Sequence, residues 1–245
     1  MINTGKKLQL DFYNQGLTEP FFGCALEKTL CESNSPYLMA ISMGESIQAG
    51  RDITYANHYI EENALNIPFV RYMGTGGPVY TSDGLLKVAG LVPKGMSDLD
   101  SVCKMVADIY TRLGIDTDYV EGTNDIKIQG KKVSGVTHGT PLGDYDYVGF
   151  FFSLYNDYER AAQAMKLTKH TTNLSDRAAG IHETHPDITK EQIIEAVKLE
   201  LISRGFNLKD VAFSKDKQLV DRVAENELGI FRNESFIKRA YVDKP

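Results

Sequence analysis

The sequence predicts an α+β fold in which a mixed, mainly antiparallel sheet is flanked by helices. Stretches with the apolar pattern of strands are interleaved with stretches that have the spacing of amphipathic helices. Most of the strand-like stretches are joined by short turns, which favours antiparallel pairing over the long crossovers of a doubly wound parallel sheet. With 245 residues, 42% of them hydrophobic, the chain has the size and apolar content of one large domain.

Six stretches have the apolar spacing of a helix, and two of them carry clear capping signals. Ser97 is the predicted N-cap of one helix, with Asp100 three residues later, and Gly114 ends it. Thr189 and Gln192 have the spacing of a capping box, and Gly205 ends that helix. The six predicted helices span residues 21–34, 57–66, 97–114, 157–166, 189–205 and 214–228.

The strand-like stretches lie mainly in the first two thirds of the chain, and a polar segment, residues 170–186, is predicted to be a loop. Residues 125–129 and 132–136 form a predicted hairpin around Gly130. The whole chain, residues 1–245, is predicted to be a single domain, with 187–245 as a helical C-terminal part packed on it. The remaining predicted strands span residues 37–43, 46–51, 67–71, 78–81, 85–92 and 147–155.

Composition excludes several classes of function. The formal net charge is −6, from 33 acidic and 27 basic residues, which disfavours binding along a nucleic-acid backbone. The three cysteines are scattered and none has C-x-x-C spacing, which argues against a disulfide framework and a zinc site. The N-terminal residues lack the apolar core of a signal peptide, and no apolar run is long enough to span a membrane. We therefore expect a cytoplasmic protein with neither a nucleic-acid nor a membrane partner.

The stretch RYMGTGGPVYTSDG, residues 71–84, places three glycines directly after a predicted strand. Gly74, Gly76 and Gly77 leave backbone N–H groups uncovered, and such groups can bind an anion, with Arg71 as an additional donor. The spacing is neither that of a Rossmann fingerprint nor that of a P-loop. An ordinary turn between two strands remains an alternative explanation.

A second stretch, GTNDIKIQGKKVSG, residues 122–135, contains the predicted hairpin with Lys131 and Lys132 at the start of its return strand. Adjacent residues of a strand face opposite sides, so only one of these lysines can point into a pocket. A lysine there could contact a phosphate oxygen and a carboxylate oxygen together, as an acyl-adenylate site requires. The alternative is a solvated hairpin.

Taken in order, these stretches resemble the biotin/lipoate protein ligase superfamily and, within it, the lipoate–protein ligases. EPFFGCALEKTLCE is similar to the early helix of that family, and ISMGESIQAGRD to the strand pair that follows it. IPFVRYMGTGGPVYTSDG resembles the glycine motif, NDIKIQGKKVSG the lysine motif, and VAENELGIFRNESFIKRA the closing segment. The resemblance implies the class II biotin/lipoate ligase-like catalytic domain.

The resemblance also implies roles for individual residues. Lys132 matches the catalytic lysine, which contacts the lipoyl carboxyl group and the phosphate, and Arg71 matches an arginine that meets the phosphate. Asn124 and Asp125 match a pair beside the nucleotide, where Asp125 is the implied Mg²⁺ ligand. The implied binding positions for nucleotide and acyl chain are Arg71, Gly76, Gly77, Pro78, Val79, Asn124, Asp125, Lys132 and His138.

The implied activity is that of an ATP-dependent, acyl-adenylate-forming ligase. Lipoate or octanoate would react with ATP, with Mg²⁺ as cofactor, to give an acyl-AMP. The acyl group would then pass to a lysine of a lipoyl acceptor protein, of the 2-oxoacid dehydrogenase E2 type or the glycine cleavage H protein type. The chain resembles a short form without the C-terminal accessory domain of many bacterial ligases, and such a form can need an accessory subunit.

Four positions depart from the family pattern, and they keep other functions open. Tyr72 replaces the second arginine, Thr75 a glycine, Thr81 a histidine and Leu85 an asparagine. These changes support the alternative of a non-catalytic or partner-dependent lipoate-binding paralogue. An octanoyl or lipoyl transferase of the same fold needs a late cysteine nucleophile, and no cysteine follows Cys103. A biotin ligase is disfavoured because the chain has no tryptophan.

Overall fold

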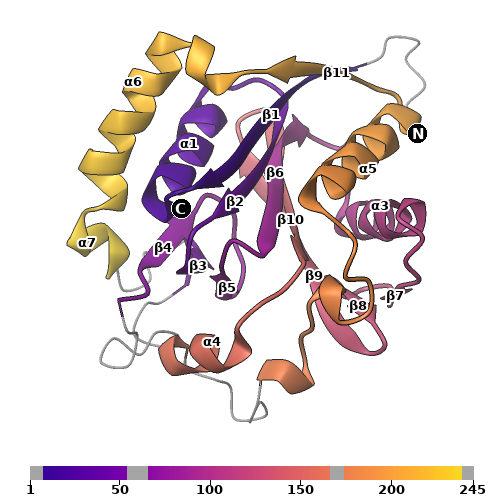
Figure 1. Cartoon of the computed structure of the whole chain (residues 1–245). Coiled ribbons are helices and arrows are strands. Elements are labelled where there is room, and N and C mark those ends of the chain that lie inside the picture. The colour runs from indigo at the N-terminus through magenta and orange to yellow at the C-terminus, as the bar shows by residue number, and fades with distance from the viewer. Residues whose placement is uncertain (1–7, 54–65, 166–173, 239–245) are drawn as a thin grey trace.

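The computed structural model describes residues 8–53, 66–165 and 174–238, which form two β-sheets and the helices around them (Figure 1). The strands are β1 Leu8–Thr18, β2 Tyr37–Met43, β3 Ser46–Gly50, β4 Phe69–Tyr72, β5 Val79–Thr81, β6 Leu85–Pro93, β7 Asp118–Tyr119, β8 Asp125–Ile128, β9 Lys131–Leu142, β10 Tyr145–Ser153 and β11 Phe206–Val211. The α-helices are α1 Pro20–Glu32, α3 Leu99–Arg112, α4 Tyr158–Ala164, α5 Lys190–Ser203, α6 Lys217–Asn226 and α7 Glu234–Ile237.

The larger sheet has eight strands in the order β11-β1-β2-β6-β10-β9-β8-β7. Strand β1 runs parallel to both of its neighbours, β11 and β2. All other neighbouring strands of this sheet are antiparallel. The predicted α+β class with a mixed, mainly antiparallel sheet is therefore confirmed.

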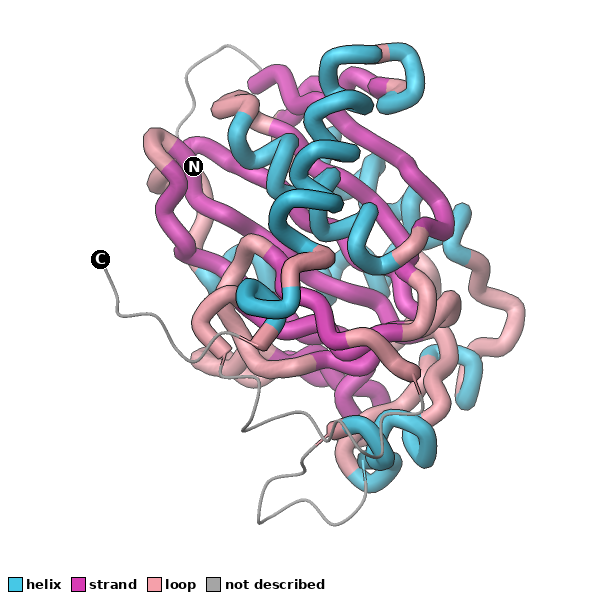
Figure 2. Tube along the Cα trace, turned by 90° about the vertical axis from the view of Figure 1, so that its left-hand side faces the viewer, coloured by secondary structure: helices cyan, strands magenta, loops and turns pink. Residues whose placement is uncertain are grey.

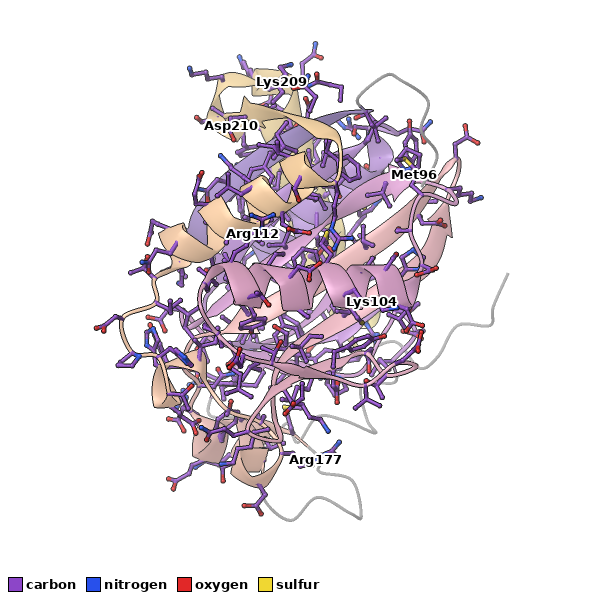
Figure 3. All side chains as sticks on the ribbon, turned by 90° about the vertical axis from the view of Figure 1, so that its right-hand side faces the viewer. Met96, Lys104, Arg112, Arg177, Lys209 and Asp210 are labelled. Atoms are coloured by element: carbon purple, nitrogen blue, oxygen red, sulfur yellow. The ribbon has the colours of Figure 1, made fainter. Side chains whose placement is uncertain are left out.

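Helices cover both faces of the larger sheet, so its central strands are buried on both sides. All seven residues of β2 are buried, as expected for a strand whose alternate side chains enter two different cores. Helices α3 and α5 pack on one face, which is turned toward the viewer in Figure 3. The two helices are joined by a hydrogen bond, in which Arg112 Nε of α3 donates to Glu200 Oε2 of α5 at 2.7 Å. Helices α1 and α6 pack on the other face and lie in front of the strands in Figure 2.

The smaller sheet has three strands in the order β4-β3-β5. Strand β3 is parallel to β4 and antiparallel to β5. The connection from β4 to β5 therefore lies next to the C-terminal end of β3. Apolar residues of the small sheet and of α4 form a third core, which includes Ile47, Phe69, Tyr80 and Ala161. The glycine stretch that the sequence singled out is the connection between β4 and β5.

Most predicted helices are confirmed, with shifts at their ends. The N-cap of α3 is Asp98 and not Ser97, because the Asp98 carboxylate accepts from Ser101 N at 2.7 Å and Ser101 Oγ accepts from Asp98 N at 2.9 Å. The last long helix begins at Lys217, after its cap Asp216, and continues as a π-helical turn through Phe231. The predicted helix 57–66 lies outside the described residues apart from its last residue.

Three strands were missed by the sequence analysis. They are β1, β7 and β11, and the first and last of these pair with each other in parallel, from Leu8 opposite Phe206 to Tyr13 opposite Val211. This pairing joins segments almost 200 residues apart, so no turn between them signals it. Residues 187–238 therefore add an edge strand as well as helices, and the single-domain assignment for residues 1–245 stays a prediction.

No helix among residues 8–53, 66–165 and 174–238 is both long and apolar enough to cross a membrane.

We expect the capping box of α5 to contribute measurably to stability. Thr189 Oγ1 accepts from Gln192 N at 3.2 Å, and Gln192 Oε1 accepts from Thr189 N at 2.8 Å. Thr189→Ala should lower the free energy of unfolding by about 1 kcal/mol, because an N–H group of the first turn loses its partner. Urea unfolding measures the change, and Thr189→Ser, which keeps the hydroxyl, should stay close to wild type. Equal losses in the two variants would contradict a capping role.

Candidate functional site

The glycine turn, which we define as residues 73–78, is held against the end of β3 by its backbone. Gly50 N donates to Gly76 O at 3.1 Å and Arg51 N donates to Gly74 O at 3.1 Å. A Cβ on Gly50 would lie only 2.6 Å from Gly76 N, so a larger residue at position 50 would push the turn away. The close approach of these two backbones thus depends on glycine.

The other side of the glycine turn rests on β9 and β10 of the larger sheet. A Cβ on Gly74 would lie 2.4 Å from Tyr147 Cε1, so the backbone of the turn sits directly on this buried ring. The Thr75 carbonyl accepts from Thr137 Oγ1 at 2.8 Å and from Tyr72 Oη at 3.1 Å. The turn therefore connects the small sheet to the face of the larger one.

Gly76 and Gly77 present the backbone groups that could bind an anion. Gly76 has a φ of +135°, which disfavours any residue with a side chain, and Gly77 is exposed with open space around its Cβ position. Within the described part of the chain, the N–H groups of both residues have no hydrogen-bond partner. Pro78 and Val79 follow as half-buried residues. These four predicted residues are thus neighbours on the outer side of the turn.

A β-bulge determines the direction of Lys132. In the pairing of β8 with β9, Ile126 lies opposite Ser134 and Lys127 opposite Lys132, so Val133 is the extra residue. Val133 is buried in the core under α3, and Ser134 Oγ lies 2.8 Å from Tyr110 Oη of α3. Two consecutive residues thus face α3, which leaves Lys132 on the opposite face.

That opposite face is the one on which the glycine turn lies. A Cβ on Gly135 would meet Lys132 Nζ at 2.9 Å, and two residues further along β9 Thr137 bonds to the turn. Lys132 Nζ also lies 5.7 Å from the centre of the Phe151 ring on β10. Lys131 instead borders a separate small cavity next to Glu183 and Thr184. The structure thus brings Lys132, but not Lys131, to the side of the glycine turn.

The backbone of Lys132 is fixed from a second side by residues 177–179. Lys132 N donates to Arg177 O at 2.8 Å, and Ala179 N donates to Lys132 O at 3.0 Å. The polar composition of this segment predicted only a loop. Its pairing with β9 limits how far the lysine backbone can move.

The predicted nucleotide pair, Asn124 and Asp125, lies beside the lysine. Asp125 Oδ1 is 2.5 Å from Lys132 Nζ, and both side chains are partly exposed. Asn124 is anchored to the next strand, because its Nδ2 donates to Val136 O at 3.1 Å and its carbonyl accepts from Val136 N at 2.9 Å. The acidic charge predicted to hold a metal ion is therefore adjacent to the predicted catalytic charge.

Of the predicted site residues, Asp125 is the one whose side chain could contribute to a Mg²⁺ site. In residues 8–53, 66–165 and 174–238, no three His, Cys, Asp or Glu side chains are grouped so as to hold a metal ion. Mg²⁺ is commonly held by one or two carboxylates together with substrate phosphates and water. Asp125 can supply one such carboxylate.

Two predicted residues lie away from this arrangement. Arg71 is buried, and its guanidinium donates to four backbone carbonyls, those of Gly50, Ile53, Phe236 and Ile237, at 2.6 to 3.3 Å. It therefore ties α7 to the small sheet. His138 Nε2 is 3.0 Å from Ser97 Oγ, beside the start of α3, whereas its neighbour Thr137 contacts the turn. The roles that the resemblance gives Arg71 and His138 stay predictions. The observed contacts support these two roles less than those of the other predicted site residues.

A buried charged cluster under the glycine turn was missed by the sequence analysis. Lys87 Nζ of β6 donates to Glu27 Oε2 of α1 at 2.8 Å, Tyr147 Oη donates to the other oxygen of this carboxylate, and Lys87 Nζ lies 4.4 Å from the centre of the Tyr72 ring. The pKa values of Tyr72 and Tyr147 are raised well above the usual range, mainly by burial and secondly by the nearby Glu27 charge. The available signal was a lone lysine within the apolar run LLKVAGLV, since a charge in a buried strand requires a partner.

The chain also matches a known protein family over most of its length. The family model of the lipoyl protein ligase A/B catalytic domain matches residues 19–202, well over half of the chain. The chain belongs to this family. The matched region contains the glycine turn, Lys132 and the buried cluster under the turn.

Two curated bacterial proteins resemble this chain. The lipoate–protein ligase of Streptococcus pyogenes is 27% identical over 188 residues, which cover 69% of this chain and 53% of that protein. The lipoate-protein ligase LplJ of Bacillus subtilis is 23% identical over 224 residues, covering 85% of this chain and 66% of that protein. The chain thus spans between about half and two thirds of the length of these relatives.

A solved structure shares the fold across nearly the whole chain. It is from a bi-partite lipoate protein ligase and its E2 lipoyl domain from Thermoplasma acidophilum, with a TM-score of 0.79 and 14% sequence identity. The match covers 97% of this chain and 98% of that one. At this identity the likeness shows the fold alone.

The contact between Gly74 and Tyr147 predicts a specific steric effect. In Gly74→Ala the added methyl group would overlap with the edge of the buried Tyr147 ring. We therefore expect a loss of roughly 1–3 kcal/mol in the free energy of unfolding. Gly77→Ala is the matched control, because the position of its Cβ is open and its stability should be close to wild type. Thermal unfolding of both variants measures the difference. If Gly74→Ala is as stable as Gly77→Ala, the turn does not rest on Tyr147 as described.

Proposed function

We propose that this chain is an ATP-dependent lipoate–protein ligase, or its catalytic part, which activates lipoate or octanoate and transfers the acyl group to a protein lysine. Its family supports this, as do the ligands of two solved structures with the same fold. A putative lipoate protein ligase of Thermoplasma acidophilum holds lipoic acid, and lipoate-protein ligase A holds ATP. Each is 14% identical to this chain, so the substrates are part of the proposal.

The observation that carries the proposal is the position of Lys132 on the same face as the glycine turn. In the first half-reaction, a carboxylate oxygen of the acid attacks the α-phosphorus of ATP. A bond forms between them, the bond to pyrophosphate breaks, and acyl-AMP remains. The Lys132 ammonium would contact both the carboxylate and the α-phosphate, where it stabilises the charge that builds up during transfer.

Other residues of the site would position the nucleotide. The N–H groups of Gly76 and Gly77 can donate to phosphate oxygens, and the acyl chain would lie beside Pro78 and Val79. Asn124 and Asp125 would lie next to the nucleotide, with Asp125 as a ligand of Mg²⁺. When bound, Mg²⁺ supplies positive charge beside the phosphates. Because Asp125 now pairs with Lys132, nucleotide binding would have to share or replace this ion pair.

In the second half-reaction, a lysine amine of the acceptor attacks the acyl carbonyl. An amide bond forms, the mixed anhydride breaks, AMP leaves and the amine loses a proton. The acceptor would be a lipoyl domain of the 2-oxoacid dehydrogenase E2 type or a glycine cleavage H protein. The fold shared with a bi-partite ligase supports an accessory subunit as a further partner. A cytoplasmic location completes the proposal.

Substitution of the two adjacent lysines tests the assignment of Lys132. We expect Lys132→Ala to lower the rate of lipoyl-AMP formation by about 10²- to 10³-fold, the usual loss for one transition-state donor. Lys131→Ala should retain most of the rate, because that side chain borders a different cavity. Mass analysis of lipoyl-AMP formed from lipoate and ATP, with the accessory subunit added where one is identified, provides the measurement.

Two outcomes would contradict the proposal in different ways. Equal rates for the two variants would show that Lys132 has no special part in the reaction. Lipoate binding by the wild-type chain without any lipoyl-AMP, with and without a partner, would instead identify a lipoate-binding paralogue.

A further inference from the structure

The ammonium of Lys132 lies over Gly135, in the space that a side chain at position 135 would take. A Cβ on Gly135 would lie 2.9 Å from both Lys132 Nζ and Lys132 Cε. Real Cβ atoms do not approach other atoms this closely, so any larger residue at position 135 would displace the end of the lysine. The missing side chain of Gly135 therefore provides the space for the ammonium.

Side chains of the two neighbouring strands border this space. Asp125 of β8 lies opposite Gly135 in the strand pairing, and Asp125 Oδ1 is 2.5 Å from Lys132 Nζ. The register of β10 with β9 places Phe151 next to Gly135 on the other side, and a Cβ on Gly135 would lie 2.9 Å from Phe151 Cε1. The ammonium is thus bordered by a carboxylate on one side and by an aromatic ring on the other.

The Phe151 ring faces the site. Phe150 and Phe152, on either side of it, belong to the core under α3 and α5, and alternate residues of a strand face opposite sides. Phe151 is half-buried, and among the described residues it belongs to none of the three hydrophobic cores. Its ring centre is 5.7 Å from Lys132 Nζ, within the range of a cation–π contact. Core packing does not account for an aromatic residue at this position, whereas the contact with the ammonium does.

The two neighbours of the ammonium would behave differently when a nucleotide binds. In the proposed function Asp125 is a ligand of Mg²⁺, so its ion pair with Lys132 has to be shared or replaced. The Phe151 ring is uncharged and cannot take part in that exchange. Its attraction for a cation comes from the negative face of the ring and persists when the carboxylate turns to the metal ion.

We propose that Phe151 is a positioning residue, which holds the Lys132 ammonium over Gly135 and thereby beside the reacting carboxylate and α-phosphate. The inference rests on the proposed function for the identity of the reacting groups. The contact itself belongs to the protein without substrates and can be measured in their absence.

Fluorinated phenylalanines at position 151 test the inference, because each added fluorine weakens the negative face of the ring and changes its shape little. We expect kcat for lipoyl-AMP formation to fall stepwise from mono- to trifluorophenylalanine, by about fivefold in total, and by a similar factor in Phe151→Leu. Phe151→Tyr keeps an aromatic face and should stay within about twofold of wild type. The same fluorinated series at Phe150, in the core under α3, is the matched control and should leave kcat unchanged.

Gly135→Ala separates this role from a general effect on the fold. Its methyl group would displace the ammonium, so we expect kcat to fall by about tenfold. Fluorination at Phe151 should then have no further effect, because the contact that it weakens is already lost. The same stepwise losses in the wild-type and Gly135→Ala backgrounds would overturn the inference, as would the absence of any loss in the wild type.

Nuclear magnetic resonance of the protein with ¹³C-labelled methyl groups on its lysine amines reports on the contact without any substrate. The face of an aromatic ring shifts the resonances of nearby methyl groups upfield. We expect an upfield shift at Lys132, identified by its absence in Lys132→Arg, that is retained in Phe151→Tyr and lost in Phe151→Leu. A shift that is the same in the wild type and Phe151→Leu would overturn the inference.

The two proposals fail in distinguishable ways. If the wild type binds ATP but forms no lipoyl-AMP, the ligase assignment fails, and the dissociation constant of ATP across the fluorinated series decides the role of Phe151. If lipoyl-AMP forms at a rate that fluorination leaves unchanged, the ligase assignment stands and the role of Phe151 is rejected. If the wild type neither binds ATP nor forms lipoyl-AMP, both proposals are rejected.

Discussion

The close contact between the glycine turn and Tyr147 is the constraint on which the site depends. Gly74 lets the backbone of the turn lie directly on the ring, and the Thr75 carbonyl accepts from Tyr72 and Thr137. Because the turn belongs to the small sheet and Tyr147 to the larger one, this contact sets the two sheets relative to each other. The uncovered N–H groups of Gly76 and Gly77 are thereby held over a defined part of the larger sheet.

A single extra residue in β9 places the lysine at that part of the sheet. In a regular strand Lys132 would share a face with Ser134, which contacts Tyr110 of α3. The bulge at Val133 changes this, so that Lys132 faces the turn together with Gly135 and Thr137. Residues 177–179 pair with the backbone of Lys132 and hold the bulged strand in place. The backbone geometry of β9 therefore determines where the Lys132 side chain lies and which way it points.

The buried cluster gives a physical context for one departure from the family pattern. The resemblance places an arginine where this chain has Tyr72, so the expected cation is missing at that position. Here the ammonium of Lys87 lies 4.4 Å from the centre of the Tyr72 ring, and a positive charge is thus still present beneath the turn. Its partner Glu27 comes from α1, which links the early helix to the same site. An ion pair this deeply buried is stable only when its partners are held in good geometry.

Patterns in the sequence were enough to predict the fold class, most elements and the residues proposed for the two halves of the site. Local patterns were sufficient for these, because hydrophobic spacing, capping residues and glycine turns act over a few neighbouring residues. They also showed that only one of Lys131 and Lys132 could face the site. The choice of Lys132 over Lys131 follows from the tertiary structure, because the bulge at Val133 depends on the pairing of β9 with β8. The parallel pairing of β1 with β11, the use of Arg71 to bind α7 and the pairing of Lys87 with Glu27 likewise join residues distant in sequence. Contacts of this kind follow from how the chain packs, and no local pattern carries that information.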